Sequence, residues 1–206
     1  MIESQLGIEV VGNLRTSFNI APMQYGYVVT NTEKDHLQYM TWGLIPHWVR
    51  DGVNKGKLIN ARKEGISAST SFRIPIRRRR CLVLADSYYE WKREGLNESP
   101  YRIIQDGASM MMLAGVWDIW EEGTKAIKSF SIITIPSTPE LNHISDRCPL
   151  VLETQELQDQ WLNDLDLDTV LKIMSTRPTK LKPYPISKKV NSPKFNSIEL
   201  HEERTS

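Results

Sequence analysis

Six short runs of β-branched and aromatic residues, each bounded by turn-forming residues, most constrain what this chain can fold into. Runs of this composition predict strands, and turn signals such as Asp106-Gly107 between them predict chain reversals. Many short strands at this spacing favour an antiparallel sheet that is partly closed into a barrel. The runs are Tyr25–Thr30, His36–Trp42, Arg80–Leu84, Tyr101–Ile104, Met110–Trp117 and Phe130–Ile135.

Helical signals are fewer. We expect short helices at Pro139–Ile144, Thr154–Trp161 and Leu165–Met174, and the second opens with the cap-forming Thr154. Prolines at positions 178, 183, 185 and 193 predict an extended C-terminal segment that wraps the body. The sequence therefore predicts an α+β fold with a β-rich, barrel-like core, built as a single domain over residues 1–206 with a flexible tail at 199–206.

Composition excludes several classes of protein. With 40% hydrophobic and 25% charged residues in 206, the chain is neither disordered nor a disulfide scaffold. Its apolar stretches are far shorter than the about 20 residues that cross a bilayer, and its start does not resemble a secretory signal. Because Cys81 and Cys148 are the only cysteines and the four His are scattered, we expect a reduced cytoplasmic protein without metal or cofactor.

Charge is balanced overall but unevenly distributed. The formal net charge is +1, yet Arg73 and the run Arg77–Arg80 place five arginines within eight residues. Five lysines between positions 180 and 194 make the C-terminal region basic as well. Segregated charge of this kind can present a positive face to phosphate, although an ordinary solvated surface explains it equally well.

Polar residues inside apolar strings indicate where chemistry could lie. Asn60 and Arg62 alternate with apolar neighbours, so in a strand they share a face suited to a phosphate, a carboxylate or a base edge. Glu90 stands between two aromatic residues, where desolvation would raise its pKa for proton transfer. The alternatives are a structural hydrogen-bonding pair and an exposed carboxylate on an edge strand.

Three further strings carry similar ambiguity. Arg147 follows Asp146 in a turn that leads into an apolar run, and it could simply be exposed. Trp48 follows a proline and could stack on a base or pack in the core. Asn19, ahead of the turn at Pro22, could be purely architectural.

Together these strings resemble the SOS response-associated peptidase (SRAP) family, whose members shield abasic sites in DNA. The matching elements occur in family order and cover about residues 17–198. They are Asn19–Pro22, Trp42–Trp48, Ile59–Glu64, Phe72-Arg73, Arg80–Leu82, Ala85–Lys92, Asp146–Leu152 and Val190–Lys194.

The resemblance implies a partner, single-stranded DNA with an abasic site, and a reaction. Family members use an N-terminal Cys, whose amine and thiol close a thiazolidine ring on the sugar aldehyde. By position, Asn60 would hold the reacting end, Glu90 would handle protons, and Ser145 stands where the family has an acid–base His. The implied DNA contacts are Trp48 to a base and Arg62 and Arg147 to the backbone, with Arg80 added by charge alone.

Two departures fall on this chemistry. Position 2 is Ile2 and no Cys comes before Cys81, so the family's ring cannot form by the family route. Ser145 does not titrate near neutral pH, and His143 could replace the family His only after a rearrangement. Either the chain binds DNA without crosslinking it, or its true start lies upstream. The strand lost with the family N-terminus could be replaced by Ile8–Val11.

The leading hypothesis is a single-stranded DNA-binding protein that acts at abasic sites in the DNA damage response, with crosslinking and autoproteolysis lost or impaired. One alternative is a hydrolase or peptidase that uses Glu90 with Ser145 or Cys148. Another is a non-enzymatic interaction module on the same fold. We expect a monomer that is cytoplasmic, and associated with the nucleoid when bound to DNA.

Overall fold

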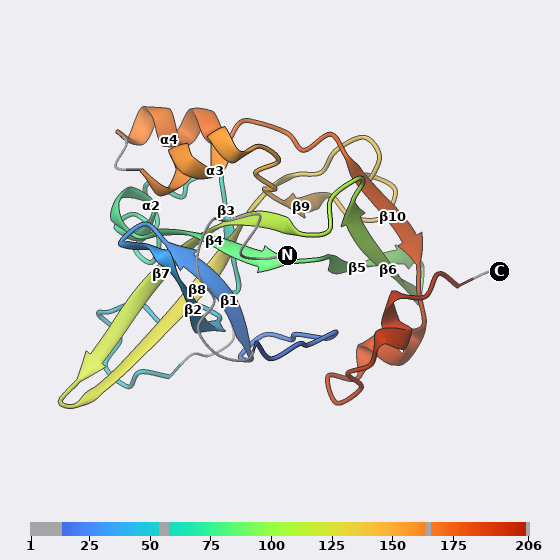
Figure 1. The fold of residues 1–206 in the computed structure, drawn as a ribbon, viewed down its shortest axis with the longest axis horizontal. Helices are drawn as coiled ribbons and strands as arrows, with labels where there is room; N and C mark the ends of the chain where they lie inside the picture. Colours follow the sequence, from blue (N-terminus) through green and yellow to red (C-terminus); the bar gives the residue numbers. More distant parts are fainter. Residues whose placement is uncertain (1–13, 54–57, 164–165, 205–206) are drawn as a thin grey trace.

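The computed structural model of the chain describes residues 14–53, 58–163 and 166–204, with a closed five-strand barrel at its centre (Figure 1). Around the barrel the strands follow the order β2-β1-β4-β7-β8, and these neighbours are antiparallel. A short parallel pairing of Thr41 with Ser129 and Trp42 with Phe130 closes the ring between β2 and β8. The predicted α+β domain with an antiparallel, barrel-like core is confirmed. The five strands are β1 (Tyr25–Thr30), β2 (Glu33–Trp42), β4 (Arg80–Ala85), β7 (Met111–Glu122) and β8 (Lys125–Pro136).

Side chains fill the inside of this barrel. A Cβ atom on Gly115 would lie 2.9 Å from both the Cys81 Sγ and a Val83 methyl group, so the space at this crossing admits only glycine. Gly26 is nearly as close to the ring of Phe130, at 3.2 Å. A five-strand barrel is narrow enough for side chains to fill it, so its interior is a core and offers no room for a ligand.

Two short strands lengthen the sheet at one end of β8. β3 (Asn60–Arg62) runs parallel to β8 with Arg62 opposite Thr134. β9 (Arg147–Pro149) runs antiparallel to β8 with Pro149 opposite the same Thr134. Since Thr134 has a partner on both sides, β3 and β9 flank opposite edges of β8. Both strands carry residues that the sequence predicts for the site.

A second sheet of three strands lies beside the barrel, at the right of Figure 1. Its order is β10-β6-β5, formed by β10 (Leu181–Pro185), β6 (Asn97–Gln105) and β5 (Tyr88–Glu94). The Ile186 N–H, just past β10, donates to the Pro100 carbonyl of β6 at 3.0 Å. Because backbone N–H groups alternate in direction, Pro183 and Pro185 occupy the positions whose N–H would point away from the sheet.

The C-terminal segment wraps onto this second sheet, as the sequence predicts. It forms two 3₁₀ turns, η1 (Lys188–Asn191) and η2 (Ile198–His201). Leu200, which lies in the stretch expected as a tail, is fully buried in η2. The buried Asn19 amide donates to the carbonyls of Val190, Ser192 and Phe195, each at 3.1 Å, and so has the architectural role that its sequence context suggests.

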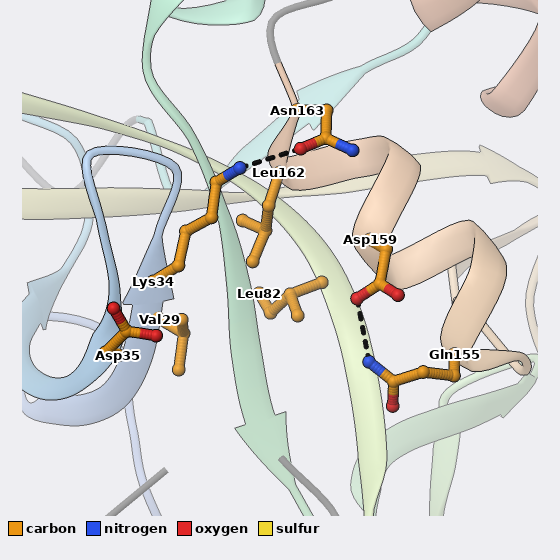
Figure 2. Close-up of a pocket in the computed structure, with 8 residues that line it drawn as sticks. All are labelled: Val29, Lys34, Asp35, Leu82, Gln155, Asp159, Leu162 and Asn163. Atoms are coloured by element: carbon orange, nitrogen blue, oxygen red, sulfur yellow. Dashed lines mark hydrogen bonds between the residues drawn. The ribbon is translucent and has the colours of Figure 1, made fainter. Parts of the chain in front are cut away.

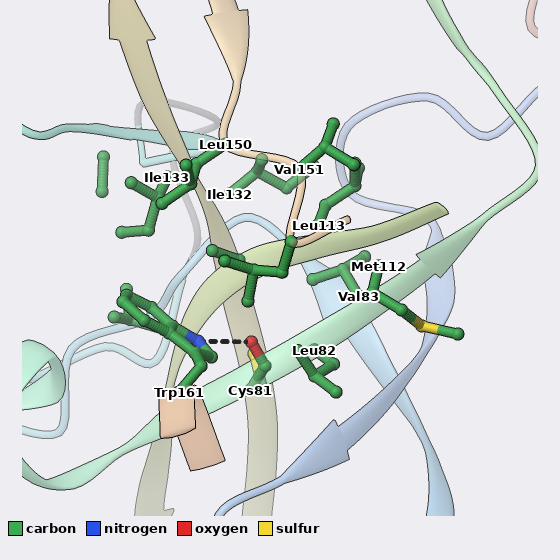
Figure 3. Close-up of a cluster of buried hydrophobic side chains, with 14 of the residues drawn as sticks. Cys81, Leu82, Val83, Met112, Leu113, Ile132, Ile133, Leu150, Val151 and Trp161 are labelled. Atoms are coloured by element: carbon green, nitrogen blue, oxygen red, sulfur yellow. Dashed lines mark hydrogen bonds between the residues drawn. The ribbon is translucent and has the colours of Figure 1, made fainter. Parts of the chain in front are cut away.

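Three α-helices in the described residues, α2 (Pro75–Arg78), α3 (Gln155–Leu162) and α4 (Leu167–Ile173), lie on the outside of the barrel. α3 begins as predicted, because the Thr154 hydroxyl accepts a hydrogen bond from Leu157 N at 3.3 Å. Near its end, the fully buried Trp161 donates through Nε1 to the Cys81 carbonyl at 3.0 Å (Figure 3). None of the described helices is long and apolar enough to span a membrane.

Two helical features differ from the sequence-based expectation. Residues 139–144 form successive turns, because Leu141 and Asn142 both donate to the Thr138 carbonyl, and Ile144 and Ser145 both donate to that of Leu141. Shared acceptors tighten the chain so that it reverses into β9 and does not continue as a helix. The short α2 was not predicted, since its arginine-rich sequence carries no apolar period.

Candidate functional site

Asn60 and Arg62 lie on one face of β3, as their alternation in the sequence predicts. Both side chains are exposed, while Ala61 between them is fully buried. The parallel pairing with β8 fixes this orientation, because a slip of one residue would bury the amide and the guanidinium. The strand therefore presents two hydrogen-bonding groups to solvent from a rigid support.

Arg147 is held at the same end of β8 as Arg62. Its guanidinium donates to the Thr134 carbonyl at 2.7 Å and to the Thr134 hydroxyl at 3.2 Å. It also donates to the Glu64 carboxylate at 2.9 Å. Since Thr134 is the register partner of Arg62, two guanidinium groups flank one residue of β8. Such a pair is suited to contact successive phosphates.

Glu64 is a part of this arrangement to which sequence reasoning assigned no role. Partial desolvation would raise the pKa of its carboxyl group, but the Glu64 backbone N–H and the Arg147 guanidinium outweigh it and lower the pKa below the usual range. Glu64 is therefore ionised at neutral pH and occupies the place on Arg147 that a phosphate would take. Only the register of β3 beside β9 reveals this contact.

Glu90 lies half-buried on β5, an edge strand of the second sheet. Desolvation raises the pKa of its carboxyl group, and the nearby negative charge of Asp146 raises it further. The Trp91 backbone N–H acts in the opposite direction but does not cancel the effect. The Asp146 interaction also shows that the turn before β9 faces Glu90. The sequence-based expectation of a desolvated carboxyl group at this position thus agrees with the geometry.

Tyr88 and Cys148 form a buried layer beneath that turn. The Tyr88 hydroxyl is buried and has no hydrogen-bond partner among the described residues. Burial raises its pKa, and the neighbouring Cys148 and Glu90 raise it further. Cys148 is itself buried, and desolvation raises the pKa of its thiol. A thiol in this setting stays protonated and inaccessible, so it is poorly suited to act as a nucleophile.

Ser145 serves the turn itself. Its hydroxyl accepts a weak hydrogen bond from the Arg147 N–H at 3.4 Å, and its own N–H donates to Leu141. No hydrogen bond joins the Ser145 hydroxyl to Glu90 among the residues that the structure describes. His143, the other candidate for the missing imidazole, is exposed two residues earlier.

Arg80 is not available to DNA, so its assignment as a phosphate contact is wrong. Its side chain is fully buried, and its guanidinium donates to the carbonyls of Trp161, Ile76, Arg77 and Asn163. These carbonyls belong to the ends of α3 and α2, where backbone acceptors lack helical partners. Arg80 therefore fastens two helices to β4.

Trp48 is exposed, with 54% of its surface accessible, but the structure holds its loop away from Thr134. Both the N–H and the ring Nδ1 of His47 lie 3.0 Å from a carboxylate oxygen of Asp118 on β7. Asp118 pairs with Ser129, five residues before Thr134 on β8. At about 3.3 Å per residue this places the anchor of the loop roughly 16 Å from Arg147's anchor.

The predicted residues therefore fall into two groups. The turn at Ser145–Arg147 connects Glu90 on one side with Thr134, Arg62 and Asn60 on the other. Trp48 and Arg80 lie outside this cluster. Calls on Met1, Ile2 and Ile8–Val11 fall on residues 1–13, outside the described residues.

The cluster is an open surface and not a pocket. A recess of about 350 Å³ lies elsewhere, between the β1–β2 hairpin and α3 (Figure 2). Its rim is already satisfied by hydrogen bonds from Lys34 to Asn163 and from Gln155 to Asp159, and no predicted site residue lines it. Small-molecule sites are usually concave and apolar, so an exposed polar surface fits an extended polymer better. No three His, Cys, Asp or Glu side chains converge as metal ligands within residues 14–53, 58–163 and 166–204.

Comparison with known proteins places the chain in a family. The model of the SOS response associated peptidase (SRAP) family matches residues 2–193. The chain is 36% identical over 198 residues to the abasic site processing protein YoqW of Bacillus subtilis (strain 168), covering 93% of this chain and 88% of that protein. It is 27% identical over 217 residues to the abasic site processing protein HMCES of Gallus gallus, covering 88% and 64%.

Structural similarity agrees with the sequence match. A crystal structure of a protein from Bacteroides thetaiotaomicron is 30% identical and has a TM-score of 0.80 to this chain. The alignment covers 89% of this chain and 82% of that one. The barrel, its flanking sheet and the ordered motifs thus have one common origin, and the chain belongs to the SOS response-associated peptidase family.

Proposed function

We propose that this protein binds single-stranded DNA at abasic sites and does not form the family's stable crosslink. The observation that carries the proposal is the pair of guanidinium groups, Arg62 and Arg147, on either side of Thr134 in an open surface. The printed names of the relatives supply the kind of lesion. Phosphate contacts would hold the strand, and the neighbouring groups would meet the sugar.

The groups beside the arginines fit an opened abasic sugar. The Asn60 amide can donate to the aldehyde oxygen and accept from a sugar hydroxyl. The raised pKa of Glu90 keeps part of its carboxyl population neutral, so it can give a proton to an oxygen that leaves as water. That step completes an imine when an amine has added to the aldehyde carbon, and the imine hydrolyses again when water adds back.

Loss of the stable product follows from the thiols. In family chemistry a thiol adds to the imine carbon, its proton passes to the nitrogen, and a ring results. Here Cys81 and Cys148 are 0% and 1% exposed, and burial raises the pKa of both thiols. Position 2 in the sequence is Ile2. The described chain thus offers no accessible thiol to trap an imine.

Incubation with an oligonucleotide that carries one abasic site tests the chemistry. We expect no adduct that survives denaturation, and a borohydride-dependent adduct if a protein amine reaches the aldehyde. The control is an oligonucleotide of the same sequence without the lesion. A heat-stable adduct formed without borohydride would contradict the loss of crosslinking.

Binding is tested separately by fluorescence anisotropy with the same two oligonucleotides. An Arg62→Gln, Arg147→Gln double variant should bind the strand more weakly and lose a salt-dependence slope of about 0.7 per phosphate contact. A variant with two exposed lysines removed, Lys182→Gln with Lys188→Gln, controls for net charge. Equal losses in both variants would show that the arginine pair has no special role.

A further inference from the structure

A second basic surface lies around α2, apart from the site described above. Arg73, Arg77 and Arg78 are exposed, and none of them pairs with a carboxylate in the described part of the chain. Helical hydrogen bonds such as Arg73 N to Ser69 O and Arg79 N to Pro75 O run through this stretch. Arg73 and Arg77 therefore stand four residues apart on one helical face, where like charges repel each other.

The fold holds these arginines in place. The buried guanidinium of Arg80 donates to the Ile76 and Arg77 carbonyls at 3.0 and 2.9 Å, which fixes the end of α2. Arg79 is paired with the buried Asp118, and its guanidinium lies 5.7 Å from the centre of the Trp117 ring. A mobile surface would let the charges separate, whereas here the backbone beneath them is fixed.

An exposed aromatic residue belongs to the same surface. Asp118 binds Arg79 through one oxygen and His47 through the other, so α2 and the loop after Pro46 meet at this carboxylate. The loop carries the exposed Trp48 and the exposed Arg50. Trp120 fixes it further by donating to the Val49 carbonyl at 2.6 Å. We call Trp48, Arg50, Arg73, Arg77 and Arg78 the α2 patch.

We infer that the α2 patch is a second nucleic-acid site, which takes the sugar-phosphate backbone of DNA flanking the lesion and stacks Trp48 on a base. Guanidinium groups without acidic partners beside an exposed indole are the combination that binds single strands without regard to sequence. The inference rests on the proposed function, because it extends the same strand beyond Arg62 and Arg147. The anchor at Asp118 and Ser129 is roughly 16 Å along β8 from Thr134, so a longer strand is needed to reach both.

The test compares short and long unmodified single strands by fluorescence anisotropy over a range of salt. The triple variant Arg73→Gln, Arg77→Gln, Arg78→Gln should bind the long strand more weakly, with a salt slope reduced by about 2, or about 0.7 for each lost phosphate contact. Its binding to a strand too short to span both sites should be unchanged. Retention of charge in Arg73→Lys, Arg77→Lys, Arg78→Lys should restore the slope.

The matched control removes three exposed lysines from the opposite side of the molecule, with Lys180→Gln, Lys182→Gln and Lys188→Gln. Thermal melts of each variant establish that it is folded. An unchanged slope in the arginine variant, or an equal fall in the lysine control, would overturn the inference. If the unaltered protein binds no single strand at all, the proposed function fails with it, whereas wild-type binding with an unchanged arginine variant rejects the α2 patch alone.

Discussion

Arg147 meets a carboxylate in the free protein at the point where a phosphate would bind. Glu64 lies 2.9 Å from its guanidinium and is ionised at neutral pH, while Thr134 fixes the other side of the group. The ion pair is partly exposed, and pairs of this kind contribute only about 0–1 kcal/mol. A phosphate can therefore displace Glu64, and the carboxylate acts as a weak competitor that also orients the arginine.

Glu64→Gln should consequently tighten binding of single-stranded DNA, by up to about fivefold, which corresponds to the upper end of that range. The amide keeps the shape of the side chain but removes the charge that competes with phosphate. Anisotropy titrations at constant salt measure the change, with the exposed Glu122→Gln as the matched loss of one negative charge. Weaker binding by Glu64→Gln would mean that orientation of Arg147 matters more than competition.

Glu90 makes the stability of the protein depend on pH in a stated direction. Desolvation raises the pKa of its carboxyl group above the ordinary value of 4.5, so the folded state holds this proton more tightly than the unfolded state. Its contribution to stability is greatest below the unfolded pKa and declines as pH rises through the folded pKa. Glu90→Gln should therefore raise the melting temperature at pH 7 and have less effect at pH 4.

Thermal melts of Glu90→Gln and of the exposed Glu98→Gln at both pH values check this expectation. If the two variants respond alike, the desolvation of Glu90 has no measurable cost. A gain for Glu90→Gln that is larger at pH 4 than at pH 7 would reverse the sign of the argument.

At the scale of elements, one buried arginine joins α2 and α3 to the barrel. Arg80→Leu would leave several carbonyls at the ends of these helices without a donor, each costing about 1–3 kcal/mol. We expect the free energy of unfolding to fall by about 3 kcal/mol or more in urea titrations. The exposed Arg78→Leu should change it by less than about 0.5 kcal/mol. A small loss for Arg80→Leu would show that water replaces the missing donor.

The sequence predicts the strands better than the site, for a physical reason. The run Tyr25–Thr30 matches β1 residue for residue, and Met110–Trp117 covers most of β7, because strand signals are local. β10 was expected only as extended chain, since Pro183 and Pro185 conceal a strand that pairs through its other edge. The turns at 139–144 contain helix-like spacing, but shared acceptors stop the helix.

Site residues divide along the same line. The common face of Asn60 and Arg62 follows from alternation in a strand, and the desolvation of Glu90 follows from its aromatic neighbours. Arg80 looks like its exposed neighbour Arg78 in the sequence, because the carbonyls that bury it come from α3, about eighty residues later. Glu64 likewise becomes visible only when β9 is placed beside Thr134. Contacts between distant segments carry the information that local patterns lack.

For the whole molecule, Asn19 connects the start of the described chain to its end. Its amide is buried and serves three carbonyls of the segment 190–195. Asn19→Ala should lower the free energy of unfolding by about 1–3 kcal/mol, because the carbonyls lose their donor. Hydrogen exchange should become faster in η1 and η2 and stay unchanged in the barrel strands. The exposed Asn142→Ala serves as control, and faster exchange throughout the barrel would contradict a local clamp.

The prolines of β10 have a consequence for how copies of this protein tolerate crowding. A sheet edge with free N–H groups can recruit the edge of a neighbour, and the outcome is a growing fibre. At Pro183 and Pro185 the outward donors are missing, and the Pro185 carbonyl already accepts from Arg204 N at 2.9 Å. Many molecules lined up along one damaged strand would therefore touch at this edge without zipping together, and each could leave independently.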